Sequence, residues 1–307
     1  MAPSRRSLVA IGIATLLGGC GLGPGRGTND VSVVVTRDFG QRLVKSVAHA
    51  KVPGSETVMR LLERSFHVQT RYGGGFIESI DGLSGAPPHL DWFYYVNGVE
   101  ATLGAAGTGI HRGDRVWWDL HDWTATDSIP AVVGSFPEPF LHGTGGRRWP
   151  TTLACATDTA PACAKVASEL KAIGVPAATQ TIGSASGTDS IAVVVGTWKD
   201  VRGELAGTLI AHGPAASGIY ARFAGPDGGT LELLDPAGRV ARSLGAGAGL
   251  IAATSQSSAA PTWLIIGTDP AGVGAAAAAL TASRLRDHFA LAVQDGRDMP
   301  VPLKAAS

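Results

Sequence analysis

One aromatic run followed by Asn-Gly constrains the fold of this chain more than any other feature of its sequence. Residues 92–96 read Trp-Phe-Tyr-Tyr-Val, and Asn97 and Gly98 follow directly. Asn and Gly tolerate the positive φ angles that both central residues of a type I′ turn require, and this turn joins two antiparallel strands. The sequence therefore predicts a β-hairpin whose aromatic side chains alternate between the two faces of a sheet.

The segments around this hairpin predict an α+β domain over residues 30–124. One helix is expected to begin at Ser55, a good N-cap, because Val58, Leu61 and Leu62 then share one helical face. Further strands are expected at residues 31–36, 41–49, 76–80 and 116–123. One helix beside a mixed sheet is typical of a β-grasp-like arrangement.

The following part of the chain, residues 128–300, predicts an α/β sandwich domain with a mixed sheet. A Pro-rich connector at residues 128–140 comes first, and strand and helix signals then alternate. An amphipathic helix is expected at residues 162–173, and an Ala-rich helix from Asp269 to about Arg286. Strands are expected at residues 151–156, 191–195, 219–223, 230–234, 263–266 and 289–293.

The N-terminus carries the parts of an exported lipoprotein leader. A basic pair, Arg5 and Arg6, precedes the apolar run of residues 8–17. This run is too short to span a membrane, which takes about 20 residues in a helix, so it fits the core of a signal peptide. The run ends in Leu17-Gly-Gly-Cys20, which resembles a bacterial lipobox.

The lipobox predicts that residues 1–19 are a signal peptide, and that Cys20 becomes the first mature residue and carries acyl chains such as palmitate. The Gly-rich residues 20–29 would then form a flexible tether to the cell membrane. The alternative is an ordinary signal peptide that is cleaved elsewhere, with Cys20 removed or free. Either cleavage places the protein outside the cytoplasm.

Export allows a disulfide between the two remaining cysteines, Cys155 and Cys163. Their spacing differs from the C-x-x-C of redox enzymes and zinc ribbons, which favours a structural disulfide. Two buried thiols or a redox pair are the alternatives. A disulfide here would connect the end of a strand to the start of the helix at residues 162–173.

Four ordered motifs give the first domain a resemblance to a known family. They are Val-Pro-Gly-Ser-Glu-Thr-Val at 52–58, Gly-Phe-Ile-Glu-Ser-Ile-Asp-Gly at 75–82, the hairpin run at 92–98 and Gly-Asp-Arg-Val-Trp-Trp at 113–118. Together they resemble the transcobalamin-like C-terminal domain, which is catalogued as a domain of unknown function. The resemblance implies a corrinoid as the first ligand to consider, because the related domain of transcobalamin and intrinsic factor closes over cobalamin. This chain departs from that pattern, since its second domain is α/β rather than a helical barrel, and its cofactor stays unknown.

The aromatic strands supply the first candidate ligand site. Trp92 and Tyr94 share one side of the predicted sheet, Trp117 and Trp118 face opposite sides, and Trp123 lies beyond them. The helix covers one face of such a sheet, so rings on the other face could bind a planar ligand or a sugar. The alternative is that both faces are covered, one by the helix and one by the second domain.

A repeated strand-Gly-Thr pattern supplies the second candidate site. Val-Val-Val-Gly-Thr at 193–197 and Leu-Ile-Ile-Gly-Thr at 264–268 each place a hydroxyl after a buried strand. Ligands of α/β proteins bind at these strand ends, which makes Thr197, Thr268 and Asp269 candidate ligand residues. Helix capping is the alternative role.

A metal site is a further hypothesis for four residues near the end of the first domain. They are His111, Asp114, Asp119 and His121, of which the last two share a strand face. The ligand spacing of a known zinc site is missing. Solvated turn and edge residues are therefore expected here instead of a metal site.

Charge and missing motifs narrow the classes of function. Lys plus Arg and Asp plus Glu both number 25, so the formal net charge is zero, which argues against nucleic acid as a partner. The sequence has no G-x-S-x-G, H-E-x-x-H or P-loop motif. We therefore expect a membrane-anchored, exported lipoprotein that binds a small molecule or an envelope protein without catalysis. A structural or adhesive envelope module is the alternative, followed by an unrecognised hydrolase.

Overall fold

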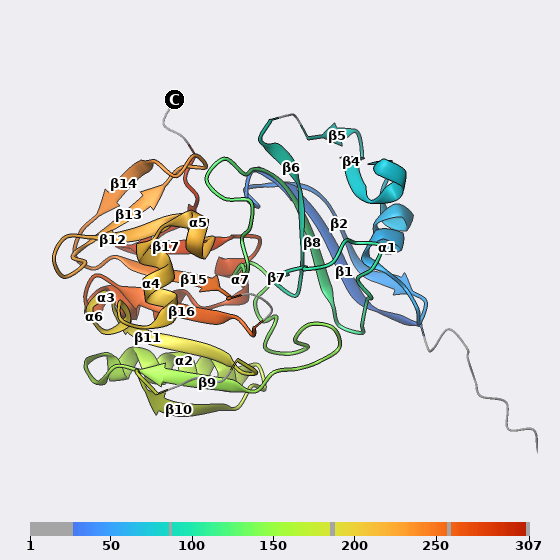
Figure 1. The fold of residues 1–307 in the computed structure, drawn as a ribbon. Helices are drawn as coiled ribbons and strands as arrows, with labels where there is room; N and C mark the ends of the chain where they lie inside the picture. The colour runs from blue at the N-terminus through green and yellow to red at the C-terminus, as the bar shows by residue number, and fades with distance from the viewer. Residues whose placement is uncertain (1–26, 86–87, 185–187, 257–258, 305–307) are drawn as a thin grey trace, which may run out of the picture.

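The computed structural model describes residues 27–85, 88–184, 188–256 and 259–304. The predicted leader and Cys20 lie outside these residues. In the part of the chain that is described, no helix is long and apolar enough to cross a membrane. An N-terminal half, residues 27–124, and a C-terminal half, residues 125–304, lie side by side (Figure 1).

A five-stranded sheet forms the centre of the N-terminal half. Its strands are β1 (Thr28–Arg37), β2 (Arg42–Val52), β6 (Leu90–Val96), β7 (Val99–Glu100) and β8 (Arg115–Asp122). Their spatial order is β2-β1-β8-β6-β7, in which β1 and β8 are parallel and the other neighbours are antiparallel. The predicted hairpin is β6 and β7, and Asn97 and Gly98 have φ angles of 55° and 78°, as a type I′ turn requires.

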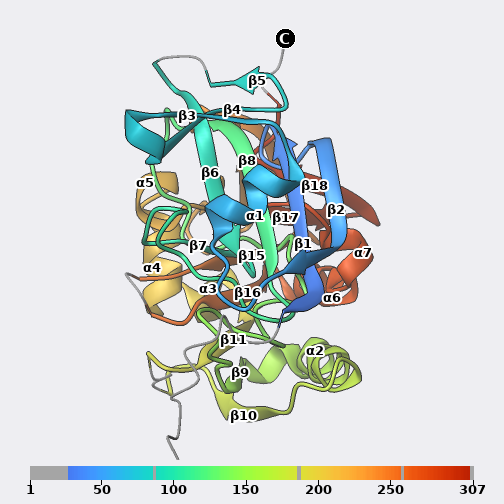
Figure 2. The ribbon, with the colours of Figure 1, turned by 90° about the vertical axis from the view of Figure 1, so that its right-hand side faces the viewer.

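The helix α1 (Val58–Ser65) covers the outer face of this sheet (Figure 2). Its buried side packs with Val33 and Trp118 in one apolar cluster. The N-cap is Thr57 rather than the predicted Ser55, and its Oγ1 accepts a hydrogen bond from the N–H of Arg60 at 3.3 Å. A separate antiparallel sheet follows α1 and consists of β3 (Val68–Arg71), β4 (Phe76–Ile80) and β5 (Leu83–Ser84). The N-terminal half is therefore β-grasp-like, as predicted.

A seven-stranded mixed sheet forms the centre of the C-terminal half. Its strands, in spatial order, are β10 (Ala177–Thr181), β9 (Thr151–Cys155), β11 (Ile191–Thr197), β16 (Thr262–Gly267), β15 (Gly249–Thr254), β17 (Ala290–Gln294) and β18 (Arg297–Val301). The first four strands run parallel to one another, and β15, β17 and β18 form antiparallel pairs. The predicted combination of an α+β and an α/β part is confirmed.

Helices cover both faces of the seven-stranded sheet. The helices α2 (Ala160–Ala172) and α6 (Pro270–Ala279) share one apolar cluster with Val193 and Ile265 of the sheet. The opposite face packs against α3 (Trp198–Val201) and α4 (Leu205–Ala211), in a cluster that includes Val194 and Leu264. That second cluster also takes in an antiparallel sheet of β12 (Ala221–Ala224), β13 (Thr230–Leu234) and β14 (Val240–Leu244), which follows α5 (Pro214–Ser217).

The Ala-rich helix is shorter than predicted. It ends at Ala279, and a separate short helix, α7 (Ala282–Leu285), follows. The backbone leaves the helical conformation at Leu280, which has a ψ of 73°. Thr281 is extended and caps α7, because its Oγ1 accepts a hydrogen bond from the N–H of Arg284 at 3.4 Å.

One apolar core joins the two halves. Trp117 and Tyr95 lie on the face of the five-stranded sheet that is turned away from α1. Their rings are tilted against each other, with centroids 5.8 Å apart. The ring centroid of Phe289, from the C-terminal half, lies 5.2 Å from that of Trp117 and 5.5 Å from that of Tyr95. Ile129 and Tyr220 belong to the same cluster. The second face of the N-terminal sheet is therefore covered by the C-terminal half.

Candidate functional site

The tryptophans proposed from the sequence are packed by protein on both faces of the five-stranded sheet. Trp92 and Trp118 are 8% and 3% exposed and lie in the cluster under α1, whereas Trp117 is 0% exposed and faces the C-terminal half. Trp123 is half-buried, and its ring lies edge-on to that of His89 at 5.1 Å. The structure therefore has the second of the two arrangements that the sequence left open.

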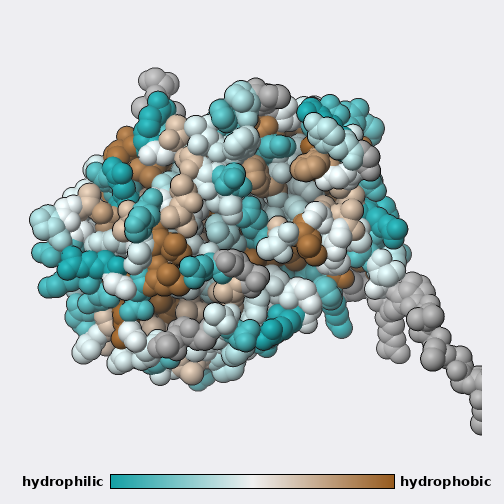
Figure 3. All heavy atoms as spheres, viewed as in Figure 1, coloured by the Kyte–Doolittle hydropathy of each residue, from teal (hydrophilic) through white to brown (hydrophobic). Residues whose placement is uncertain are grey.

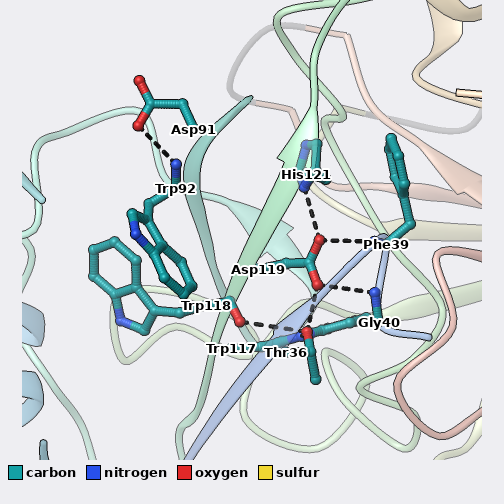
Figure 4. A network of polar contacts seen from close by, with 9 residues as sticks. All are labelled: Thr36, Phe39, Gly40, Asp91, Trp92, Trp117, Trp118, Asp119 and His121. Atoms are coloured by element: carbon teal, nitrogen blue, oxygen red, sulfur yellow. Dashed lines mark hydrogen bonds and ion pairs between the residues drawn. The ribbon is translucent and has the colours of Figure 1, made fainter. Parts of the chain in front are cut away.

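Asp119 lies at the centre of a buried hydrogen-bond network (Figure 4). Its Oδ1 accepts hydrogen bonds from Thr36 Oγ1 at 2.5 Å and from the N–H of Gly40 at 2.8 Å. Its Oδ2 accepts from the N–H of Phe39 at 3.0 Å and from Nδ1 of His121 at 2.9 Å. The prediction that Asp119 and His121 are solvated is wrong, because the turn between β1 and β2 folds over them and leaves both side chains buried.

Asp114 is also buried, contrary to the prediction of a solvated turn. Its Oδ1 accepts a hydrogen bond from Nδ2 of Asn97 at 2.9 Å, and its Oδ2 accepts from the N–H of His111 at 2.7 Å. Burial raises the pKa of Asp114, and these two hydrogen bonds oppose that rise. Across the residues that the structure describes, no group of three or more His, Cys, Asp or Glu could hold a metal ion.

The two strand-Gly-Thr ends lie next to each other, since Thr197 pairs with Gly267 in the parallel register of β11 and β16. Thr197 begins α3, and Asp200 Oδ2 accepts from both the N–H and the Oγ1 of Thr197, at 2.8 and 2.6 Å. Asp269 caps α6 by accepting from the N–H of Gly272 at 2.9 Å. Their polar atoms are thus used in capping, the alternative role that the sequence allowed.

The hydroxyl of Thr268 lies on the neighbouring loop rather than in an open space. Its Oγ1 is 3.2 Å from the carbonyl oxygen of Gly245, to which it donates, and it accepts from the N–H of Ala248 at 3.2 Å. Asp269 also accepts from the N–H of Gly247, at 2.7 Å. These contacts hold the loop before β15. They also occupy the polar side-chain atoms of Thr268 and Asp269, which leaves few of them to bind a ligand.

A cavity of about 670 Å³ lies where the N-terminal half meets the connector. Its apolar walls come from Val96, Val99, Leu103, Pro130 and Trp149, and its polar groups include Glu100, Thr108, His111 and Ser128. This volume is within the range of sites that enclose drug-sized ligands, and such sites are common between domains. The cavity is therefore the candidate functional site.

Tyr94 positions one wall of this cavity. Its ring stacks on that of Trp118, with centroids 4.7 Å apart. Its hydroxyl donates to the carbonyl oxygen of Leu103 at 2.5 Å and lies 2.8 Å from Oγ1 of Thr108. Burial raises the pKa of Tyr94, so the phenol keeps its proton and can donate at neutral pH. Of the aromatic residues proposed from the sequence, Tyr94 is the one that shapes the cavity.

The opposite wall is held by pairing between β7 and the connector. The N–H of Glu100 donates to the carbonyl oxygen of Pro130 at 3.0 Å, and Val99 forms a bridge with Ala131. This pairing brings Ser128 to Glu100, whose Oε2 accepts from the Ser128 hydroxyl at 2.6 Å. Residues far apart in the sequence thus meet in one polar pair at the cavity.

The charges of the cavity select among ligands. Burial raises the pKa of Glu100, and the hydrogen bond from Ser128 opposes that rise. The described residues that line the cavity include no Lys or Arg. An anionic ligand in this cavity would lose water and find no Lys or Arg to pair with. The cavity therefore favours neutral or cationic ligands over carboxylates and phosphates.

Sequence reasoning did not find Glu100 or Ser128. The hairpin prediction contained a signal for the first, because a residue two positions after Asn97-Gly98 must lie on the returning strand. Ser128 belongs to the irregular connector, whose path the sequence does not define.

Cys155 and Cys163 form a disulfide, with Cα atoms 6.0 Å apart. It connects the end of β9 to α2.

On the face seen in Figure 3, apolar residues form separate patches between hydrophilic ones, and one lies over α4, where Leu205 is 57% exposed. Scattered patches of this kind are common on folded domains and do not define a site.

In comparisons with known proteins, part of the N-terminal half matches a protein family. Residues 55–122 match the family described as a domain of unknown function (DUF4430). A crystal structure of a protein from Ruminococcus gnavus ATCC 29149, described as a "putative metal binding protein", is similar at 17% identity over 30% of this chain and 95% of that chain. The TM-score of 0.25 is too low to support a conclusion about function. No curated protein matches the chain.

Proposed function

We propose that this protein binds a small molecule, without catalysis, in the cavity beside Glu100. The observation that carries the proposal is the cavity itself, whose volume of about 670 Å³ suits a ligand and whose mostly apolar walls surround a few polar groups. Both walls are fixed by hydrogen bonds, one through Tyr94 and one through Glu100, so little ordering free energy is lost on binding.

The ligand that we propose is a neutral or cationic molecule with a large apolar surface and one hydrogen-bond donor for Glu100. A corrinoid is the first compound to test, because the four sequence motifs resemble the transcobalamin-like domain. A whole corrinoid is larger than the drug-sized molecules that a cavity of about 670 Å³ encloses, so only one side of it would enter. We do not propose metal binding, because the described residues offer no suitable group of ligands.

We further propose that acyl chains on Cys20 anchor the protein to the outer face of the cell membrane. The lipobox supports this, and the Cys155–Cys163 disulfide fits an oxidising compartment outside the cytoplasm. We expect Cys20→Ala to move the protein from the membrane fraction to the soluble fraction or to block its processing. Unchanged membrane association with an unmodified first residue would exclude the anchor.

Copurification tests the ligand proposal. The protein is purified from its own host, and native mass spectrometry identifies the small molecule bound to it. We expect Ala101→Trp, which fills the cavity from a half-buried position, to abolish binding, and Glu100→Gln to weaken it at least tenfold. Glu63→Gln, an exposed site on α1, is the matched control. Equal binding by Ala101→Trp and the unmodified protein would contradict the proposal.

Calorimetric titration with cobalamin tests the corrinoid separately. Heat that the unmodified protein shows and Ala101→Trp does not would support a corrinoid in this cavity. A titration without heat would remove the corrinoid from the proposal, while the copurified compound would still decide whether the cavity binds a ligand.

Tyr72 and Phe76 favour a second candidate function, contact with another component of the cell envelope. Their side chains are 84% and 64% exposed, and their rings meet edge-on with centroids 5.8 Å apart. Tyr72 has a φ of 51°, a conformation that is uncommon for a bulky residue and is more often kept at functional positions. We expect the double variant Tyr72→Ser, Phe76→Ser to keep its thermal stability and to lose crosslinks to envelope proteins in intact cells. Unchanged crosslinks would argue against this role.

A further inference from the structure

We infer that a second cavity, of about 490 Å³, binds the anionic group of a small carboxylate or phosphate compound. This cavity lies where β14, the end of β18 and the turn between β1 and β2 meet. Its lining includes Gln41, Arg242, His288 and Lys304, with Pro300 and Leu303 as apolar walls. The site is separate from the proposed ligand cavity and has the opposite charge preference.

The charge of this lining is positive and is not neutralised by neighbouring acids. Arg242 and Lys304 form no ion pair within the described ranges, and the described residues that line the cavity include no Asp or Glu. Arg242 donates through Nη1 to Sδ of Met299 at 3.5 Å, a weak contact that leaves most of its N–H groups for other acceptors.

The two acids whose charges act on His288 are already engaged with other cations. Asp287, next to His288, pairs with Arg115 of β8. Asp298, on β18, accepts from Nε of Arg284 at 2.9 Å. Because both carboxylates are held in these pairs, they do not neutralise Arg242 and Lys304, whose exposed side chains stay accessible to an external anion.

His288 adds a half-buried, uncharged ring to the wall of this cavity. Its Nδ1 is buried and has no hydrogen-bond partner among the described residues. Burial lowers the pKa of His288, although Asp287 and Asp298 oppose this, so the ring is mostly neutral at pH 7 and carries one N–H donor.

The frame around the cavity is fixed before any ligand arrives. Nε2 of Gln41 donates to the carbonyl oxygen of Pro302 at 2.8 Å, and the N–H of Leu303 donates to that of Leu234 at 2.8 Å. The N–H of His288 donates to the carbonyl oxygen of Leu285 at 3.0 Å. These bonds fix the wall residues and reduce the cost of ordering them on binding.

A carboxylate or a phosphate is the chemical class that this arrangement fits. A guanidinium group matches the planar oxygen pair of either anion through two parallel hydrogen bonds, and a Lys ammonium adds a point charge. The cavity has room for an organic part beyond the anionic group, against Pro300 and Leu303. The candidate ligands are therefore small metabolite-sized anions rather than a polymer.

Isothermal titration of the folded protein tests the inference with three probes at constant ionic strength: inorganic phosphate, succinate and chloride. We expect saturable heat with phosphate or succinate and none with chloride. Arg242→Gln should weaken that binding at least tenfold, and Arg242→Lys should weaken it less. Arg297→Gln, at an exposed position of β18 outside the lining, is the matched control.

The two anions separate the possible sources. Heat with phosphate alone assigns a phosphate compound, and heat with succinate alone assigns a carboxylate. Equal heats for all three salts, or an unchanged affinity in Arg242→Gln with a thermal stability equal to that of the unmodified protein, would overturn the inference. Because Ala101→Trp leaves this cavity unchanged, failure here is distinguishable from failure of the proposed ligand site.

Discussion

The ring of Trp117, from the N-terminal half, packs edge-on against the ring of Phe289, from the C-terminal half, with centroids 5.2 Å apart. The two rings lie in one apolar cluster that contains strands of both halves and helices of the C-terminal half. This contact makes the core of each half depend on the other.

Phe289→Ala should therefore destabilise the whole protein. Removing a buried Phe side chain costs roughly 3–5 kcal/mol of unfolding free energy. We expect calorimetry to show one unfolding transition that shifts as a unit. Leu205→Ala, at an exposed position on α4, is the control and should change little. Two transitions, of which only one shifts, would contradict a shared core.

Asp119→Asn should weaken the attachment of the β1–β2 turn. The carboxylate accepts four hydrogen bonds, whereas an amide offers one acceptor oxygen and brings two donors toward other donors. We expect a loss of roughly 2–3 kcal/mol in unfolding free energy, measured by urea denaturation. Asp227→Asn, in an exposed turn, is the control. A loss no larger than that of the control would argue against the network.

Glu138→Gln should change how stability depends on pH. Burial raises the pKa of Glu138, with Asp114 adding to the rise and His142 opposing it. A raised pKa in the folded state means that the folded protein binds more protons than the unfolded chain, so this group's contribution is complete below the unfolded pKa of about 4.3 and is lost as pH rises through the folded pKa.

We therefore expect the unmodified protein to lose unfolding free energy as pH rises from about 4 toward neutral, relative to Glu138→Gln, which does not titrate. Urea denaturation at a series of pH values measures the difference. Glu63→Gln, at an exposed position, should keep the slope of the unmodified protein. Parallel curves for Glu138→Gln and the unmodified protein would contradict the assignment.

The disulfide between Cys155 and Cys163 should leave no free thiol at either position in the exported protein. Alkylation without prior reduction, followed by mass spectrometry, checks this. Because the sequence separation is 8 residues, the chain-entropy model gives about 2.5 kcal/mol of stabilisation. Cys155→Ser, Cys163→Ser should lower the unfolding free energy by about that amount. Alkylation of both cysteines in the unreduced protein would contradict the bond.

The fold could be predicted because its signals are local. The Asn97-Gly98 turn, the β-branched strand at residues 31–36 and the strand-helix alternation of the second half each follow from neighbouring residues. The errors arise where distant segments meet. Asp119 was predicted to be solvated because nothing near it in sequence shows that the β1–β2 turn covers it.

The candidate site was less predictable for the same reason. Glu100 and Ser128 meet because β7 pairs with an irregular, Pro-rich connector that has no periodic signal. Tyr94 was proposed as a stacking surface, but it contributes its hydroxyl to a loop whose path depends on packing. Faces of strands can be read from alternation, whereas the covering of a face depends on the rest of the chain.

The position of β1 limits how this protein can be cut or recombined. The matched family segment, residues 55–122, begins after β1 and β2, yet β1 lies between β2 and β8 inside the sheet. A transplanted 55–122 fragment would expose the unpaired backbone edge of β8 and the ring of Trp117 to water. Such an edge pairs readily with strands of other molecules. A graft that is meant to stay monomeric must carry β1 and a substitute for Phe289.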